Sequence, residues 1–328
     1  MTLQVINRAP SLAPRTTPAR TRRHVLDLDD FSVEEVETVL ETATRMKDVL
    51  SRPIKKVPTL RGRTVVTLFY EASTRTRVGF EVAAKALGAD TVNVAASSSS
   101  VTKGESLIDT IRTLQALGAD FVVMRHHQAG APYVVSEEVG SSVINAGDGW
   151  HAHPTQALLD LFTIRERLGR VAGVRVAIIG DVLHSRVARS NLWGLTKLGA
   201  HVVLCGPPTL LPRAEFCDGL PWSYETTYKM DEALEGADVV MMLRMQTERQ
   251  AGGHVPSVRE YVRTYGLTEA RLARAKPGAL VMHPGPMNEG VEIDPKVARS
   301  AQSVIEAQVT NGVAVRMALL YLLSGLSA

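Results

Sequence analysis

A group of hydroxyl and guanidinium side chains follows a short apolar segment early in the chain. The segment 64–70 is rich in β-branched and aromatic residues and is typical of a buried strand. It is followed by the run Ser73-Thr-Arg-Thr-Arg77 at the predicted start of a helix. Helix capping needs one hydroxyl and no arginine, whereas several hydroxyls, a guanidinium and the N–H groups of a first helical turn together suit a phosphate dianion. We therefore expect a phosphate site formed by Ser73, Thr74, Arg75 and Thr76.

Predicted helices and strands alternate around this segment. Residues 31–50 have helical spacing and begin with the capping box Ser32-Val-Glu-Glu35. Further strands are predicted at 91–95 and 120–124, and further helices at 74–87 and 107–117, each of these helices ending at a glycine. Strands and helices that alternate at this spacing imply a parallel sheet with helices on both faces.

The same alternation starts again after residue 153. Helices are predicted at 154–168 and 187–198, strands at 175–179, 201–204, 238–243 and 279–282, and closing helices within 302–323. A chain of 328 residues is long enough for two cores of ordinary size. We therefore expect an α/β protein with two domains, each a parallel sheet flanked by helices. The expected limits are 24–153 with 305–328 for one domain and 154–304 for the other, after a flexible extension at 1–23.

The composition argues against several classes of protein. The net charge is +3 and the basic residues are spread along the chain, so a nucleic-acid-binding face is not indicated, although small anions remain suitable ligands. The 2 cysteines are too few for a disulfide framework and too weakly patterned for a zinc site. No apolar run has the length of a membrane span, and residues 1–23 lack the apolar core of a secretory signal. These features predict a cytoplasmic protein without a nucleic-acid or membrane partner.

Further motifs follow in order along the chain and, together with the Ser73–Arg77 run, resemble those of the aspartate and ornithine carbamoyltransferase family. They are Val101-Thr-Lys103-Gly-Glu105, Met124-Arg125-His126, Asn145-Ala-Gly-Asp-Gly149, His153-Pro-Thr-Gln156, Gly180-Asp181 with Arg186, Arg244-Met-Gln246 and His283-Pro-Gly-Pro286. The resemblance covers about residues 24–325. It implies the two-domain carbamoyltransferase fold and a transferase activity that needs no cofactor and no metal.

The resemblance also implies a role for each matched residue. In the family's reaction an amine attacks the carbamoyl carbon, the carbonyl oxygen becomes an oxyanion and phosphate leaves, so hydrogen-bond donors to both groups are the main requirement. The phosphate would be held by Ser73, Thr74 and Arg75. The carbonyl oxygen would be held by Thr76, Arg125 and His153. The acceptors of the carbamoyl N–H groups would be Gln156, Gly285 and Pro286. The catalytic group would comprise Arg75, Thr76, Arg125, His153 and Lys103.

The second substrate decides between the branches of the family. Aspartate brings two carboxylates, which favour the forked guanidinium of arginine. Its matched ligands are Lys103, Arg186, Arg244 and Gln246. Arg244 and the sequence His283-Pro-Gly-Pro286 resemble the aspartate branch, because an added arginine suits a second carboxylate and repels the ammonium group of ornithine. Glu289 departs from the family pattern, in which arginine is usual at this position.

The resemblance extends to assembly. It implies a homotrimer in which Ser99 and Lys103 reach into the site of the neighbouring chain. The run 182–191, the amino-terminal extension and the segment 265–269 are similar to the longer bacterial type, which assembles with a dihydroorotase or its inactive homologue.

The same motifs admit other interpretations. A nicotinamide-binding unit would need the spacing G-x-G-x-x-G, which the turn 180–185 lacks. A histidine before proline, as at His153, is by itself most often a helix-entry residue. The run Arg125-His-His127 lacks the carboxylate or thiol partners of a zinc site. A carbamoyltransferase for ornithine or another amino acid, and an inactive carbamoyltransferase-like binding protein, remain alternatives.

Overall fold

The structure, a computed structural model of the chain, describes residues 4–5, 22–95, 106–212, 223–245 and 257–325. The chain forms two compact units. The amino-terminal unit comprises residues 15–162 and 309–328, and the carboxyl-terminal unit comprises residues 1–14 and 163–308. The chain leaves one unit for the other within α5 (Pro154–Leu168) and returns within α11 (Ile305–Leu323).

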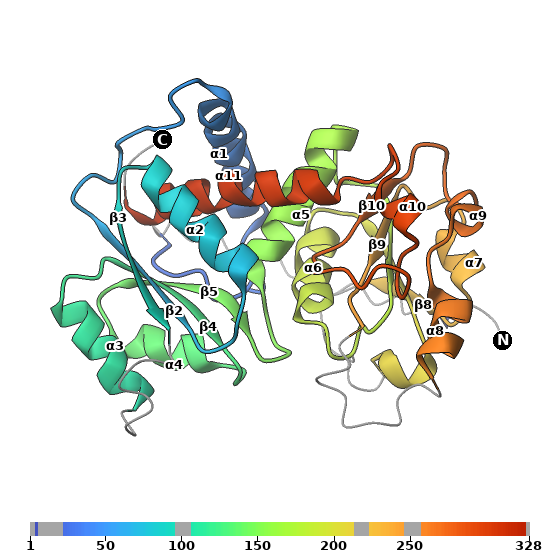
Figure 1. Cartoon of the computed structure of the whole chain (residues 1–328), viewed down its shortest axis with the longest axis horizontal. Helices are drawn as coiled ribbons and strands as arrows, with labels where there is room; N and C mark the ends of the chain where they lie inside the picture. Colours follow the sequence, from blue (N-terminus) through green and yellow to red (C-terminus); the bar gives the residue numbers. More distant parts are fainter. Residues whose placement is uncertain (1–3, 6–21, 96–105, 213–222, 246–256, 326–328) are drawn as a thin grey trace, which may run out of the picture. The chain divides into compact units, whose positions relative to one another are not determined.

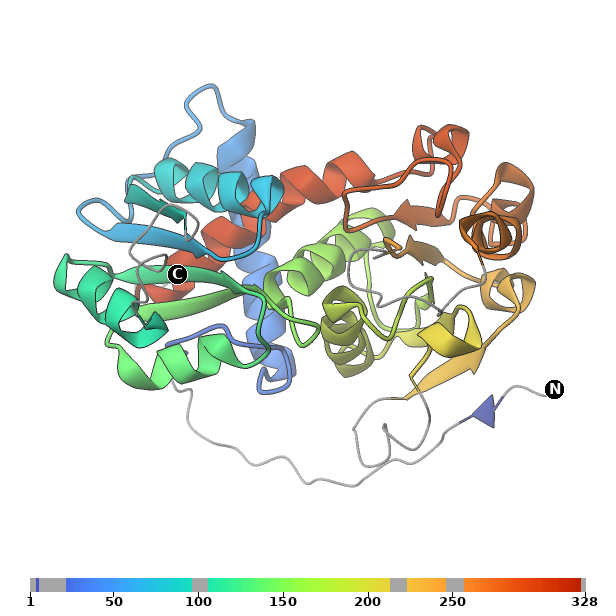
Figure 2. The same cartoon turned by 60° about the horizontal axis from the view of Figure 1, so that its bottom comes forward.

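The amino-terminal unit is built on a four-stranded parallel sheet with the order β3-β2-β4-β5. Its strands are β2 (Thr64–Phe69), β3 (Asp90–Ala95), β4 (Phe121–His126) and β5 (Ser142–Asp148). Its helices, besides the parts of α5 and α11, are α1 (Val33–Ser51), α2 (Thr74–Ala86), α3 (Leu107–Ala116) and α4 (Ala131–Glu138). Helices α3 and α4 lie on one face of the sheet and α2 on the other (Figure 1 and Figure 2).

An apolar core joins the sheet to α3 and α4. Val66 and Leu68 of β2 and Val122 and Met124 of β4 pack with Ile111 and Val135 of the two helices. Each of these side chains is almost completely buried. Val65 of β2 and Val123 of β4, which alternate with these residues, are fully buried as well. The two strands are therefore apolar on both faces, as is usual in a parallel sheet covered on both sides.

The carboxyl-terminal unit contains a six-stranded sheet with the order β1-β8-β7-β6-β9-β10. Its strands are β1 (Gln4–Val5), β6 (Arg175–Ile179), β7 (His201–Cys205), β8 (Tyr224–Thr227), β9 (Val239–Met242) and β10 (Leu280–Met282). All neighbours pair in parallel except β1, which is antiparallel to β8. A parallel sheet with helices in each unit confirms the predicted fold class.

Helices cover this second sheet as well. They are α6 (Arg186–Lys197), the 3-10 helix η3 (Pro208–Leu210), α7 (Met230–Leu234), α8 (Val258–Tyr265), α9 (Glu269–Leu272) and α10 (Pro295–Ala298). Helix α6 lies on the face opposite to α7, α8 and α9 (Figure 1). Ile179, Val203 and Val240 of the strands pack with Leu234 and Tyr261 of the helices on the α7–α8 face.

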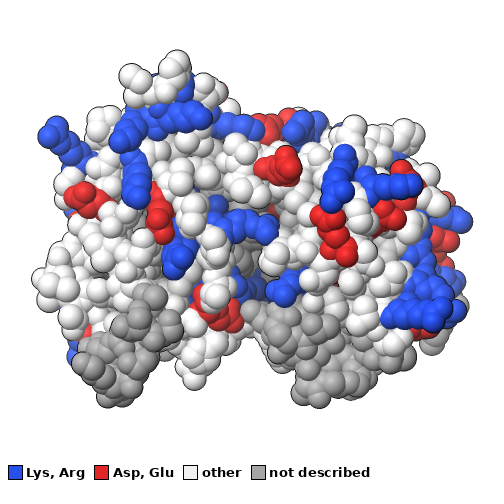
Figure 3. Space-filling view, in the orientation of Figure 1, with Lys and Arg blue, Asp and Glu red and all other residues white. Residues whose placement is uncertain are grey.

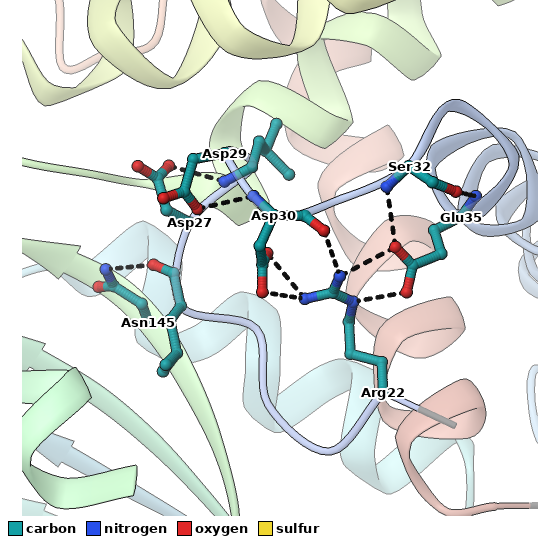
Figure 4. A network of polar contacts seen from close by, with 9 residues as sticks. Arg22, Asp27, Asp29, Asp30, Ser32, Glu35 and Asn145 are labelled. Atoms are coloured by element: carbon teal, nitrogen blue, oxygen red, sulfur yellow. Dashed lines mark hydrogen bonds and ion pairs between the residues drawn. The ribbon is translucent and has the colours of Figure 1, made fainter. Parts of the chain in front are cut away.

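The segment before α1 is held by a polar network (Figure 4). Arg22 donates to both carboxylate oxygens of Asp30, at 2.8 and 2.9 Å, and to both of Glu35, at 3.0 and 2.9 Å. Glu35 also closes the predicted capping box with Ser32, which confirms that prediction. Asn145 of β5 donates to the Leu26 carbonyl at 2.8 Å. These contacts fasten the start of α1 to the edge of the sheet.

Charges of both signs are interspersed on the face drawn in Figure 3, in keeping with the small net charge. None of the helices in the described part of the chain is long and apolar enough to cross a membrane.

Candidate active site

Three neighbouring strands of the amino-terminal unit end at the same edge of its sheet. In the order β2-β4-β5, β2 is followed by Ser73–Thr76, β4 contains Arg125 near its end, and β5 is followed by His153. Phe69 of β2 is aligned with Arg125, and the Tyr70 N–H continues the ladder to the Arg125 carbonyl at 2.9 Å. Because carboxyl ends of parallel strands form the ligand-binding edge of such sheets, the fold collects the predicted residues of this unit there.

The amino terminus of α2 has the form expected of an anion site rather than of a capped helix. Ser73 is the N-cap residue, but its side chain makes no capping bond. The Ser73 hydroxyl instead lies 3.0 Å from the Thr76 hydroxyl. The Ser73 side chain therefore accepts no bond from the first turn of α2. A helix amino terminus of this kind suits the oxygens of a phosphate group.

The two arginines of this edge are both partly shielded from water. Burial lowers the pKa of the Arg75 guanidinium. Arg125 has a side-chain exposure of 13%, and its Nε lies 3.2 Å from a Glu71 carboxylate oxygen. Its Nη1 donates to the Ala146 carbonyl at 3.2 Å. Arg125 is thus held against β5 while the Glu71 carboxylate offsets its charge.

Asp148 organises the turn that leads to His153. This fully buried carboxylate accepts bonds from Asn145 Nδ2 at 2.8 Å, the Gly130 N–H at 2.7 Å and the Ala152 N–H at 3.1 Å. The Asp148 N–H donates to the Ala152 carbonyl at 3.1 Å, which closes the turn. His153 itself is 3% exposed. The sequence motif contains Asp148 but does not indicate this supporting role, which includes a bond from Gly130, 18 residues away in the chain.

Gln156 lies in the first turn of α5 and is 7% exposed. Its Nε2 lies 3.0 Å from a carboxylate oxygen of buried Asp160. A carboxylate only accepts hydrogen bonds, so the amide is oriented with its nitrogen toward Asp160. The amide oxygen of Gln156 is then the group left to accept from a ligand.

The carboxyl-terminal unit repeats the arrangement at the ends of β6, β9 and β10, which are neighbours in its sheet. Arg186 is the first residue of α6 and is 4% exposed. Arg244 follows β9, where the Leu243 N–H continues the ladder to the Ile179 carbonyl at 2.8 Å. Gly285 and Pro286 follow β10 and are joined by a cis peptide bond. The fold therefore brings these predicted residues to one edge of this sheet.

A buried pair of side chains supports the Gly285–Pro286 loop. The Gly285 N–H donates to His283 Nδ1 at 2.8 Å, which leaves the ring proton on Nε2. Nε2 donates to Glu292 Oε1 at 3.1 Å, and the same oxygen accepts from the Asn288 N–H at 2.7 Å. His283 and Glu292 are both buried. The sequence identified the His283 motif but gave no signal for Glu292, because no local pattern links the two.

The exceptional Glu289 also has a structural partner. Its carboxylate accepts from Arg299 Nη2 at 2.9 Å, and the side chains are 38% and 74% exposed. The negative charge of Glu289 is therefore paired at the surface of this loop.

Ser99, Lys103 and Gln246 lie outside the described residues.

No group of three or more His, Cys, Asp or Glu side chains that could hold a metal ion occurs within residues 22–95, 106–212, 223–245 and 257–325. The candidate ligand His126 is instead stacked on His127, with ring centroids 4.3 Å apart.

We predict that Glu292→Ala lowers the free energy of unfolding by about 1–3 kcal/mol, because it removes the acceptor of a buried His283 N–H and of a loop N–H. Urea unfolding followed by circular dichroism measures the loss. Glu289→Ala, which removes a carboxylate from the same loop but at the surface, should change stability by no more than about 0.5 kcal/mol. Equal stability of the Glu292→Ala variant and the wild type would contradict a supporting role for the pair.

Comparison with known proteins agrees with this geometry in both units. Residues 23–166 match the family model "Aspartate/ornithine carbamoyltransferase, carbamoyl-P binding domain", and residues 172–323 match "Aspartate/ornithine carbamoyltransferase, Asp/Orn binding domain". The chain is 64% identical over 304 residues to the aspartate carbamoyltransferase catalytic subunit of Roseiflexus sp. (strain RS-1), covering 93% of this chain and 96% of that one.

Solved structures with the same fold include both branches of the family. The aspartate transcarbamoylase of Trypanosoma cruzi in complex with carbamoyl phosphate and aspartate has a TM-score of 0.84 at 30% identity, over 91% of this chain and 96% of that chain. The ornithine carbamoyltransferase of Pyrococcus furiosus also has a TM-score of 0.84 at 30% identity, over 93% and 98%. The fold is thus common to both branches, and the 64% identity to an aspartate carbamoyltransferase catalytic subunit indicates the aspartate branch. The chain belongs to the aspartate carbamoyltransferase family.

Proposed function

We propose that the protein transfers the carbamoyl group of carbamoyl phosphate to L-aspartate and releases phosphate. This reaction forms N-carbamoyl-L-aspartate and is the committed step of de novo pyrimidine biosynthesis. The observation that supports the proposal is the order β2-β4-β5, whose strands end at one sheet edge and lead to the amino terminus of α2, to Arg125 and to the turn before His153 and Gln156. The high identity to aspartate carbamoyltransferase catalytic subunits supports aspartate as the acceptor.

The proposed chemistry uses the hydrogen-bond donors of the amino-terminal unit. The aspartate amine attacks the carbamoyl carbon, and the oxyanion that forms on the carbonyl oxygen is stabilised by Thr76, Arg125 and His153. The bond between that carbon and the phosphate oxygen then breaks, and Ser73, Thr74 and Arg75 hold the departing phosphate. The amine loses its proton to the leaving phosphate, so the step is balanced without a protein nucleophile. Acceptors for the carbamoyl N–H groups are Gln156 and the carbonyls of Gly285 and Pro286.

Recognition of aspartate is assigned to the other group of residues. Arg186 and Arg244 bind its carboxylates as forked cations, together with Lys103 and Gln246. The functional domains that we propose are 24–153 with 305–328 for carbamoyl phosphate and 154–304 for aspartate, after an extension at 1–23. The ends of parallel strands that carry Arg186 and Arg244 support this assignment.

The proposed assembly is a cytoplasmic homotrimer in which Ser99 and Lys103 serve the site of the adjacent chain. A dihydroorotase or dihydroorotase-like chain is proposed as an additional partner. Similarity of the 182–191 run, the amino-terminal extension and the 265–269 segment to the longer bacterial type supports the partner.

Substrate preference is tested by phosphate release. The purified protein with carbamoyl phosphate should release phosphate when L-aspartate is added and far less with L-ornithine, because Arg244 suits a carboxylate and repels an ammonium group. A coupled phosphate assay at equal amino-acid concentrations measures both rates. Preference for ornithine would overturn the acceptor, and no release with any amino acid would favour a binding protein.

Arg75→Ala should reduce kcat/KM for carbamoyl phosphate by an amount equivalent to about 3 kcal/mol, the loss expected for a charged donor at the leaving group. Arg75→Lys should recover little, since one ammonium group cannot reproduce the guanidinium fork. Lys85→Ala is the matched control, because Lys85 is an exposed cation in the last turn of the same helix. If steady-state kinetics give wild-type values for Arg75→Ala, Arg75 has no part in the reaction.

The shared site is tested by mixing inactive variants. Lys103→Ala and Arg75→Ala chains should each be nearly inactive, because each removes one side of every site. After dissociation, equal mixing and reassembly, about one interface in four should contain both intact residues. Activity should rise toward that fraction of the wild type, and only after reassembly. Wild-type chains taken through the same procedure provide the control, and no recovery in the mixture would exclude sharing through Lys103.

A further inference from the structure

An arginine of α11 is buried inside the amino-terminal unit without a described counter-charge. Arg316 is 3% exposed, and its Nε has no hydrogen-bond partner in the described part of the chain. No carboxylate among the described residues forms an ion pair with it. Its guanidinium carbon lies 5.2 Å from the centre of the Phe80 ring on α2. Such a burial is costly for a cation, and an aromatic face offsets only part of the cost.

The surrounding backbone is shaped to receive this guanidinium group. A Cβ atom at Gly79 of α2 would lie 2.7 Å from Arg316 Nη1, and a Cβ atom at Gly312 of α11 would lie 2.5 Å from it. Neither position could carry another residue without displacement of the guanidinium. Glycine within a helix lowers the stability of that helix. Both α2 and α11 nevertheless have a glycine at the position that contacts the Arg316 guanidinium.

The Arg316 guanidinium lies against Gly79 of α2, one helical turn after Arg75 of the candidate phosphate site. Burial lowers the pKa of Arg316 to about 10, and the positive charge of Arg75 lowers it further in the same direction. Both groups remain protonated at neutral pH. Two like charges that influence each other are unfavourable unless an anion binds near them.

We infer that Arg316 is a positioning residue of the phosphate site, whose buried charge strengthens binding of the phosphate group at the amino terminus of α2. The inference rests on the proposed function, since it presupposes that Ser73–Thr76 bind phosphate. The bound phosphate supplies the counter-charge that Arg316 does not find among the described residues. By linkage, Arg316 stabilises the bound state more than the free state.

This role differs from a purely structural one in its effect on the free protein. An arginine kept only for packing stabilises the fold, so its replacement by a neutral side chain of similar length destabilises the protein with or without ligand. An uncompensated buried charge does the opposite, because its replacement by a well-packed apolar side chain is neutral or stabilising. Arg316→Met therefore separates the two explanations.

The experiment uses the full-length chain with inorganic phosphate as the probe. Arg316→Met should leave the thermal midpoint of the free protein unchanged or raised. It should weaken phosphate binding, measured by calorimetry, about tenfold or more, as expected for loss of one nearby charge in a partly desolvated site. The KM for carbamoyl phosphate should rise by a similar factor, while the KM for aspartate at saturating carbamoyl phosphate stays near the wild-type value. Lys85→Met, which removes an exposed cation from α2, should change none of these.

The outcomes distinguish the inference from the proposed function. Wild-type phosphate affinity in Arg316→Met, with loss of binding in Arg75→Ala, overturns the role of Arg316 and leaves the phosphate site intact. A wild-type protein that binds neither phosphate nor carbamoyl phosphate refutes the site itself. An Arg316→Met chain that is unfolded both with and without phosphate identifies Arg316 as structural and also overturns the inference. Arg316→Lys, which keeps a charge at this position, should bind phosphate more tightly than Arg316→Met.

Discussion

Parallel pairing of β2, β4 and β5 is the constraint on which the candidate phosphate site depends. The run Ser73–Thr76, Arg125 and His153 are far apart in the chain, and they come to the same edge of the sheet because the three strands point the same way and are neighbours. The register that aligns Phe69 with Arg125 sets the direction of the arginine. A shift of one residue would turn its side chain to the other face of the sheet. The apolar core that packs β2 and β4 against α3 and α4 therefore also fixes the chemistry at their ends.

A site for a dianion concentrates positive charge that is unfavourable when the site is empty. The amino-terminal unit reduces this cost unevenly. Arg125 has a carboxylate within 3.2 Å, whereas Arg316 has an aromatic ring and two glycines around it. Arg75 is partly buried, and burial lowers the pKa of its guanidinium. Within the proposed function, these positive charges are already in position in the free protein and favour the anion without a rearrangement, which is a form of preorganisation.

Local sequence patterns predicted many of the helices and strands, because these elements depend on residues that are close together in the chain. The capping box at Ser32, the helix 154–168 and the strand 175–179 have the bounds or the bonds that the sequence predicted. Strand β5 and helix α4 were missed. Strand β5 contains Asn145, Gly147 and Asp148, residue types that are rare in strands, and it is stabilised by pairing with β4 and with the segment at Val25. Helix α4 follows Gly130 in a left-handed conformation and has proline in its first turn, so it has no polar N-cap of the usual kind.

Glu292 and Arg316 were not predicted for a different reason. Glu292 supports His283, and Arg316 lies against Phe80, through contacts between segments that no periodicity connects. The sequence could indicate which residues suit phosphate, because the reaction requires their types. It could not indicate which distant side chains hold them, since that information exists only after the sheets have formed.

The fixed orientation of Gln156 has a consequence for selectivity among acyl phosphates. Because Asp160 holds the amide nitrogen, the side chain cannot rotate its amide to present a donor instead of an acceptor. Within the proposed function, an acetyl group in place of the carbamoyl group would set a methyl against that oxygen and leave it without a hydrogen bond. A carboxy group would set a negative oxygen against it, which is worse. A single buried amide would in this way reject close analogues by an unsatisfied acceptor rather than by lack of space.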